Sequence, residues 1–213
     1  MKKILFVALL LLLMQSCITS LYPLYTNETL VQKKELLATW KDKEGMYWKF
    51  SKVDDSKMYE LRCRSGNYHA IYATGMVKIG AHYFLDVQLS KEAVSDEEEA
   101  RVKKEEDNNK KKGINLFNNK DNVAHLSHNI PGHNFYKLVF KGEKIYVYPF
   151  NDEYMEELFK QRKIRIKHEK VEDSFTVLTA SSNELQAFLK KYGGDPQLFK
   201  DDEPKVLSKY VKK

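Results

Sequence analysis

Residues 70–89 read AIYATGMVKIGAHYFLDVQL, and this stretch decides the fold. Its apolar residues recur at every second position, first from Ile71 through Ala73 and Val77 to Ile79, and then from Tyr83 to Leu89. Because successive side chains of a β-strand point to opposite faces, this period predicts two half-buried strands with one wet side. The short segment IGAH at 79–82 predicts a tight turn, so the two strands should pair antiparallel.

The same period continues on both sides of this pair. Further alternating or apolar segments lie at 46–50, 59–63, 133–140, 144–150, 163–168, 174–180 and 204–210. Short turns such as DDSK and KGEK separate them, which is typical of an antiparallel meander. Eight or nine short strands must hide their edges, so we expect a mainly β fold with a curved or closed antiparallel sheet. An α+β fold, with an open antiparallel sheet covered by two helices, is the alternative.

Two segments carry helix signals instead. NDEYMEELFK at 151–160 has Asn151 as a possible N-cap and acidic residues in its first turn. SSNELQAFLKKYGG at 181–194 begins with a capping box of Ser181 and Glu184 and ends at paired glycines. We therefore expect two short helices within a single β-rich domain at 36–213.

The N-terminus has the pattern of a secretory leader. Two lysines precede an apolar run from Ile4 to Met14, which is too short for a permanent membrane span of about 20 residues. LLLMQSC at 11–17 resembles the lipobox of bacterial lipoproteins, in which the cysteine thiol is acylated, for example with palmitate, and the leader is removed. The sequence thus predicts a signal peptide at 1–16, lipidation at Cys17 and a lipid-anchored tether at 17–35. Ile18 after the cysteine favours the outer membrane of the bacterial envelope.

A charged insertion interrupts the strands at 91–112, where fifteen of the 22 residues are acidic or basic. Such a run is typical of a solvated insertion, with a partner-docking arm as the alternative. The net charge of the whole chain is +6, without a dense basic stripe interleaved with aromatics. This composition disfavours nucleic acid as a partner.

Several blocks together resemble a group of uncharacterised bacterial envelope lipoproteins: SLYPLYT, LLATW, KIGAHYFLDV, PGHNF and VLTASSNELQAFL. LLATW also resembles the Gly-x-Trp signature in the first strand of lipocalin-like barrels, with Ala38 where the glycine would stand and Trp40 as the barrel-floor tryptophan. The resemblance implies an envelope location and a lipocalin-like closed sheet, and it implies no established reaction.

Candidate chemistry is sparse, and we expect no enzyme activity and no cofactor. His125, His128 and His133 could hold a metal ion, but their spacing is not that of an HExxH helix, so turn histidines are the preferred interpretation. Cys63 shares an alternating strand face with apolar residues, which predicts a buried, inert thiol. No nucleophile elbow, P-loop or dinucleotide fingerprint is present in the sequence.

Aromatic residues on the predicted strands offer a different site. Those that could line a ligand pocket on a concave sheet face are Trp48, Tyr72, Tyr83, Phe135, Tyr146 and Tyr148. The leading hypothesis is a non-catalytic, lipid-anchored envelope lipoprotein that binds an apolar or amphipathic ligand or another envelope component. A protein–protein interaction lipoprotein without a pocket is the second hypothesis, and a histidine-based, metal-dependent hydrolase is the third.

Overall fold

The computed structural model describes residues 18–66, 68–90, 132–171, 175–200, 202 and 204–211. The predicted signal peptide, Cys17 and the charged insertion at 91–112 lie outside these residues, as do His125 and His128.

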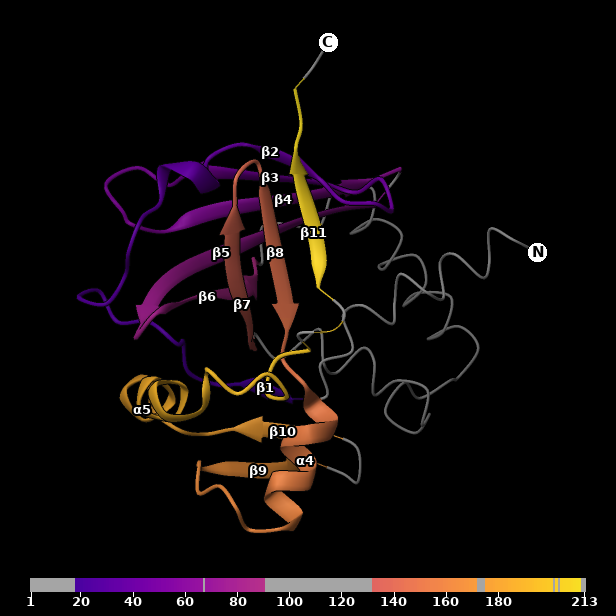
Figure 1. The fold of residues 1–213 in the computed structure, drawn as a ribbon. Helices are drawn as coiled ribbons and strands as arrows, with labels where there is room; N and C mark the ends of the chain where they lie inside the picture. The colour runs from indigo at the N-terminus through magenta and orange to yellow at the C-terminus, as the bar shows by residue number, and fades with distance from the viewer. Residues whose placement is uncertain are drawn as a thin grey trace, which may run out of the picture.

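Eight antiparallel strands form a closed barrel (Figure 1). These strands are β2 (Thr39–Lys41), β3 (Tyr47–Lys52), β4 (Tyr59–Ser65), β5 (Tyr68–Ile79), β6 (His82–Leu89), β7 (His133–Lys141), β8 (Lys144–Pro149) and β11 (Lys205–Lys209). Each pairs with the next along the chain, and β11 returns to pair with β2 through Ser208↔Lys41 and Lys209↔Trp40. The prediction of a closed, lipocalin-like sheet is confirmed, and the open-sheet alternative was wrong.

A smaller layer, inserted in the sequence between β8 and β11, packs on the outside of the barrel (Figure 1). It holds α4 (Asp152–Lys160), β9 (His168–Val171), β10 (Phe175–Leu178) and α5 (Ser182–Tyr192). β10 pairs antiparallel with β9 and parallel with β1 (Ile18–Ser20), while Ser20 of β1 pairs with His133 of β7. The short strand β1 therefore connects the outer layer to the barrel.

Both helices begin where the sequence predicts. The Asn151 side chain accepts a hydrogen bond from the Tyr154 amide, and Ser181 and Glu184 form the reciprocal capping box. α5 ends at Tyr192, with Gly193 as its C-cap. Among the described residues, neither of these helices nor any other is long and apolar enough to cross a membrane.

Side chains fill the inside of the barrel. We call this cluster the barrel core; it contains Leu36, Trp40, Met46, Phe50, Tyr59, Leu61, Cys63, Ala70, Tyr72, Met76, Leu85, Val87, Leu138, Ile145, Val147 and Leu207, all of them buried. A short 3₁₀ helix, η1 (Lys34–Leu36), precedes β2, and the Trp40 indole donates to the Leu36 carbonyl at 3.0 Å. Trp40 thus has its polar atom satisfied inside the core, as a buried indole requires.

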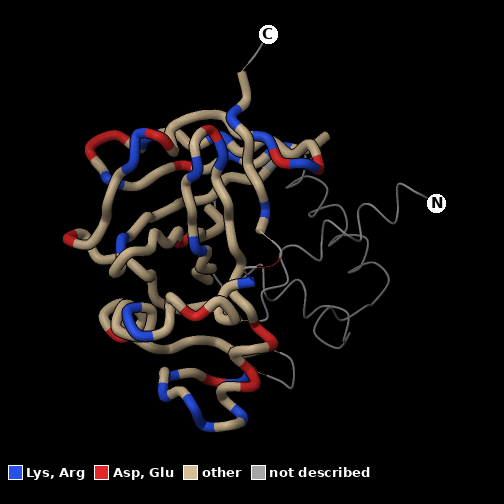
Figure 2. The backbone as a smooth tube through the Cα atoms, in the orientation of Figure 1, with Lys and Arg blue, Asp and Glu red and all other residues tan. Residues whose placement is uncertain are grey.

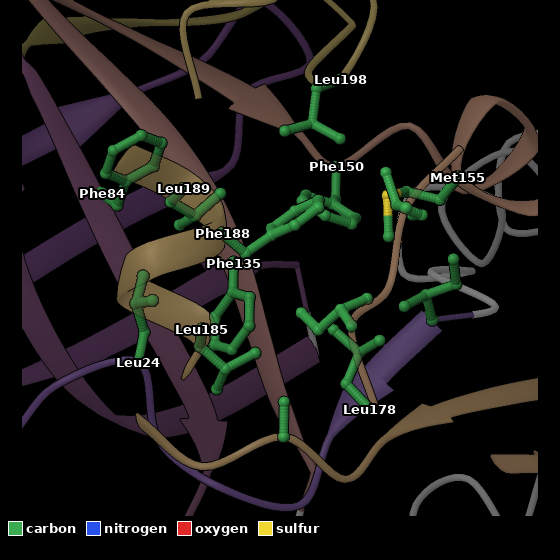
Figure 3. Packing of buried hydrophobic residues seen from close by; sticks show 14 of the residues in the cluster. Leu24, Phe84, Phe135, Phe150, Met155, Leu178, Leu185, Phe188, Leu189 and Leu198 are labelled. Carbon is green, nitrogen blue, oxygen red and sulfur yellow. The ribbon is translucent and has the colours of Figure 1, made fainter. Parts of the chain in front are cut away.

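A second apolar cluster, the outer core, lies between the barrel wall and the outer layer. Figure 3 shows residues of α5, such as Leu185 and Phe188, meeting Phe135 of the barrel and Leu24 of the N-terminal segment. Strands β5 and β6 serve both clusters, because Met76 and Leu85 belong to the barrel core while their neighbours Val77 and Phe84 belong to the outer core.

The two central strands therefore depart from the predicted pattern of one buried and one wet side. β5 and β6 each carry consecutive buried apolar residues, because α5 and the N-terminal segment cover their outer face. The face of β5 that holds Val77 and Ile79 is this outer one, and the inner face holds Ala70, Tyr72 and Met76. Alternation locates the faces of a strand, but neighbouring elements decide which of them are buried.

The N-terminal segment is part of the fold, which corrects the prediction of a tether at 17–35. Ile18, Leu24 and Leu30 are buried, and the Leu30 backbone bridges to Val77 of β5. These residues are six positions apart, and the residues between them continue neither a strand nor a helix period, so the segment looks like a loop in sequence. In the structure it lies across the outside of the barrel and fills gaps between the barrel and α5.

Candidate functional site

The six aromatic candidates are divided between the two faces of the barrel wall. Trp48, Tyr72 and Tyr83 pack with the barrel core, whereas Phe135 and Tyr148 pack with the outer core. Tyr146 lies on the outer face beside the Lys141 ammonium, 5.1 Å from its ring centre. The structure therefore does not bring the six together around one hollow.

A polar cluster lies beside Trp48. The Asp42 carboxylate, whose side chain is fully buried, accepts hydrogen bonds from the Trp48 indole at 3.1 Å and from the Lys205 ammonium at 3.3 Å. Lys205 also pairs with Glu44 at 3.3 Å. Each buried side-chain nitrogen and oxygen of this cluster has a hydrogen-bond partner, so its burial carries no unsatisfied polar group.

Cys63 lies in the barrel core, which confirms that it is buried. Burial raises the pKa of its thiol to about 12, with a smaller contribution from the negative charge of Asp42. Because the thiolate is the reactive form of cysteine, this thiol is poorly suited to nucleophilic chemistry near neutral pH.

His133 is paired with Asp86 beneath the N-terminal segment. Its Nδ1 atom lies 2.7 Å from Asp86 Oδ1, and the other carboxylate oxygen, Oδ2, accepts a 2.6 Å hydrogen bond from the Leu24 amide. Both side chains are almost fully buried, and the Tyr25 ring meets the imidazole edge-on. Burial raises the pKa of the Asp86 carboxyl, and the hydrogen bond from His133 opposes that rise.

A carboxylate that orients an imidazole is also the arrangement found in acid–base catalysis. Here the pair connects β6 and β7 to the N-terminal segment through Leu24, which explains its burial in structural terms. His133 was a candidate from the sequence but Asp86 was not, because its only signal is an acidic residue inside an apolar strand. Within the described ranges, no group of three His, Cys, Asp or Glu side chains could hold a metal ion.

A hollow of about 420 Å³ lies in the outer layer, between α5 and the segment that connects α4 to β9. We call it the basic groove. Its lining residues are Lys163, Arg165, Ile166, Lys167, Glu184, Ala187, Phe188, Lys191 and Tyr192. Figure 2 shows Lys and Arg along the loop after α4 and on α5.

Four cations and one carboxylate line the basic groove. The carboxylate, Glu184, pairs with Lys167 at 2.9 Å and caps α5 through Ser181. Lys163, Arg165 and Lys191 form no ion pair with any described residue, so the groove carries a net positive charge that is open to an anionic partner. This groove was not predicted from the sequence, because its two walls are about 20 residues apart in the chain and only the fold brings them together.

Comparisons with known proteins found no relative of this chain. No protein-family model, curated protein or solved structure matches the chain. The likeness to lipocalins therefore rests on the closed antiparallel barrel, with Trp40 in its core beside η1.

Proposed function

We propose that this chain is a non-catalytic, lipid-anchored envelope lipoprotein whose barrel is a filled scaffold that docks another envelope component on its outer surface. The observation that carries the proposal is the packing of the barrel core, whose members have between 0% and 8% of their surface exposed. Lipocalins and other small barrels that carry a ligand need an open interior. A filled interior leaves the outer surface as the place for recognition.

The outer layer supports the docking role. It holds the basic groove, with three cations that no described carboxylate neutralises, and it is built on helices and strands that are fixed to the barrel wall by the outer core. A site on such rigid elements is more precisely positioned than one on a loose loop.

The position of the first described residue supports the anchoring part of the proposal. Ile18, which directly follows Cys17, is buried in β1. An acylated Cys17 would therefore hold the domain against the bilayer without a flexible spacer, and two or three acyl chains are enough for stable attachment. The outer layer, whose strand β10 pairs with β1, would then lie at a defined height above the membrane.

Metabolic labelling tests the anchor. The full chain, with its own leader, is expressed in a bacterial host fed an alkyne analogue of palmitate, and membranes are separated from soluble protein. We expect label and membrane association for the unaltered chain and for the matched control Cys63→Ala, and loss of both for Cys17→Ala. An unlabelled parent chain, or equal labelling of Cys17→Ala, would contradict the proposal.

A further inference from the structure

We propose that the basic groove binds an extended acidic peptide, which adds as a strand along residues 163–167. This inference deepens the proposed docking function by naming the chemistry of the partner. It depends on that function only for its biological setting, because the peptide-binding experiment does not require the anchor.

Residues 163–167 alternate between exposed and buried side chains, as a strand with one covered face does. Lys163, Arg165 and Lys167 are exposed, while Ile164 and Ile166 between them are buried in the outer core. The sequence predicts a strand over 163–168, yet ladder pairing begins at His168, where β9 starts. The two isoleucines thus hold the segment against the core, and no strand among the described residues pairs with it.

The backbone of this segment has amide groups that could form hydrogen bonds with a ligand. The Lys163 amide bonds to the Leu158 carbonyl, and the Lys167 carbonyl accepts from Thr179, so both ends are fixed. Between them, the amides of Ile164, Arg165 and Ile166 have no hydrogen-bond partner among the described residues. Consecutive backbone groups of an extended segment point to opposite edges, so a peptide on one edge would pair with alternate residues of this set. Such pairing is strand addition, in which a peptide gains affinity from main-chain hydrogen bonds.

The charges specify the kind of peptide. Lys163, Arg165 and Lys167 stand at every second position, so in an extended segment their Cα atoms would be about 6.6–6.8 Å apart. A paired peptide would meet them with acidic side chains at its own alternate positions, since opposite charges facing one another across strands are stabilising. Lys191 adds a positive charge on the opposite wall of the groove.

The helical wall supplies apolar contact. Ala187, Phe188 and Tyr192 of α5 line the groove, and the Lys191 ammonium lies 4.8 Å from the centre of the Tyr192 ring. The volume of about 420 Å³ accommodates a few side chains rather than a folded domain. The fitting ligand is therefore a short extended segment with acids at positions i and i+2 and one apolar side chain toward α5.

Selection from a random heptapeptide library displayed on phage tests the inference. The target is the chain from Ile18 onward, which carries every element that the structure describes. We expect enriched sequences with Asp or Glu at alternate positions. Their synthetic peptides should bind Arg165→Glu and Lys191→Glu at least about tenfold more weakly than the parent chain, and Lys49→Glu, an exposed charge reversal on the barrel, equally well. Circular dichroism checks that all three variants fold.

A second probe separates strand addition from charge attraction alone. The best peptide is made again with its alternate backbone amides N-methylated, which removes donors and leaves the side chains unchanged. We expect at least about a tenfold loss of affinity. Equal binding of the methylated peptide, or no enrichment of acidic sequences, would overturn the inference. So would a result in which Arg165→Glu and Lys191→Glu leave peptide binding unchanged but abolish association with phosphatidylglycerol vesicles, which would assign the groove to a membrane surface.

Discussion

The barrel core and the outer core use the same strands but are built in different ways. The barrel core is made almost wholly by every second residue of the eight barrel strands, together with Leu36 of η1. The outer core draws on segments far apart in the chain, from Ile18 and Leu24 to Leu198 and Phe199. The barrel core is thus a regular, closed structure, and the outer core depends on the correct docking of separate pieces.

This difference indicates where function can be located. The interior positions of the barrel are filled by apolar side chains, so a polar or charged binding group has no space there. The outer layer, in contrast, presents a groove whose residues are not needed to close the barrel. Substitutions in each core test whether the two cores unfold as one cooperative unit and how firmly the outer elements are attached to the barrel.

Truncation of one leucine in each core should have the largest effect. Leu61 and Leu185 are 1% and 2% exposed, so Leu61→Ala and Leu185→Ala are a matched pair. Each should lower the free energy of unfolding by about 2–5 kcal/mol. Both tryptophans, Trp40 and Trp48, pack in or against the barrel core, so fluorescence reports on the barrel while circular dichroism reports on the whole.

Because β5 and β6 serve both cores, we expect the fluorescence and dichroism transitions to coincide in both variants. If Leu185→Ala lost dichroism at a lower denaturant concentration than tryptophan fluorescence, the outer layer would be an independently unfolding unit. That result would break the description of the chain as one domain.

Removal of the Asp86 carboxylate should cause the next largest loss of stability. Asp86→Ala leaves the Leu24 amide and the His133 imidazole without their partner, which should cost about 3 kcal/mol. Asp86→Asn keeps an acceptor for Leu24 and is expected to cost less. Urea unfolding measures both, and limited proteolysis of residues 18–30 should accelerate only in Asp86→Ala. An equal loss in both variants would mean that charge, rather than the bond to Leu24, matters.

Gly75 tests how closely the N-terminal segment approaches the barrel. A Cβ at this position would overlap ring carbons Cδ1 and Cε1 of Tyr25. Gly75→Ala should therefore destabilise by about 1–3 kcal/mol, and Tyr25→Ala in the same chain should recover part of that loss. Thermal unfolding of the single and double variants gives the coupling. Purely additive effects would show that Tyr25 does not pack on Gly75.

The smallest expected effect is the acid response of the α5 cap. Hydrogen bonds from Lys167 and from the Ser181 backbone and hydroxyl lower the pKa of Glu184 to about 2, from its ordinary 4.5. A carboxyl with a lowered folded-state pKa stabilises the fold above its ordinary value and loses that contribution as pH falls from about 4.5 to about 2. Glu184→Gln should flatten the stability–pH curve in this window, as followed by chemical unfolding at each pH. An unchanged curve would contradict the capping account.

Local signals in the sequence predict much of this fold. The alternation around residues 70–89, the Asn151 cap and the Ser181–Glu184 capping box all depend on neighbours in the chain, and each lies where the sequence predicts it. Closure of the sheet also follows from the number of strands whose edges need partners.

The remaining features depend on contacts between distant residues. Leu24 and Leu30 show no period because the barrel wall and α5, rather than regular geometry, determine their burial. The partner of His133 is Asp86, 47 positions earlier in the chain, and the basic groove exists only once α5 docks beside residues 163–167. For the same reason, the sequence could not separate the six aromatic candidates between the two faces of the barrel.

Native mass spectrometry of the chain from Ile18 onward, purified from a bacterial host without detergent, tests the central claim most directly. A filled barrel leaves no space for a co-purified apolar ligand, so we predict the bare polypeptide mass under gentle ionisation. A heavier species that releases a lipid-like molecule on denaturation would contradict the account. It would mean that the barrel opens to carry a ligand.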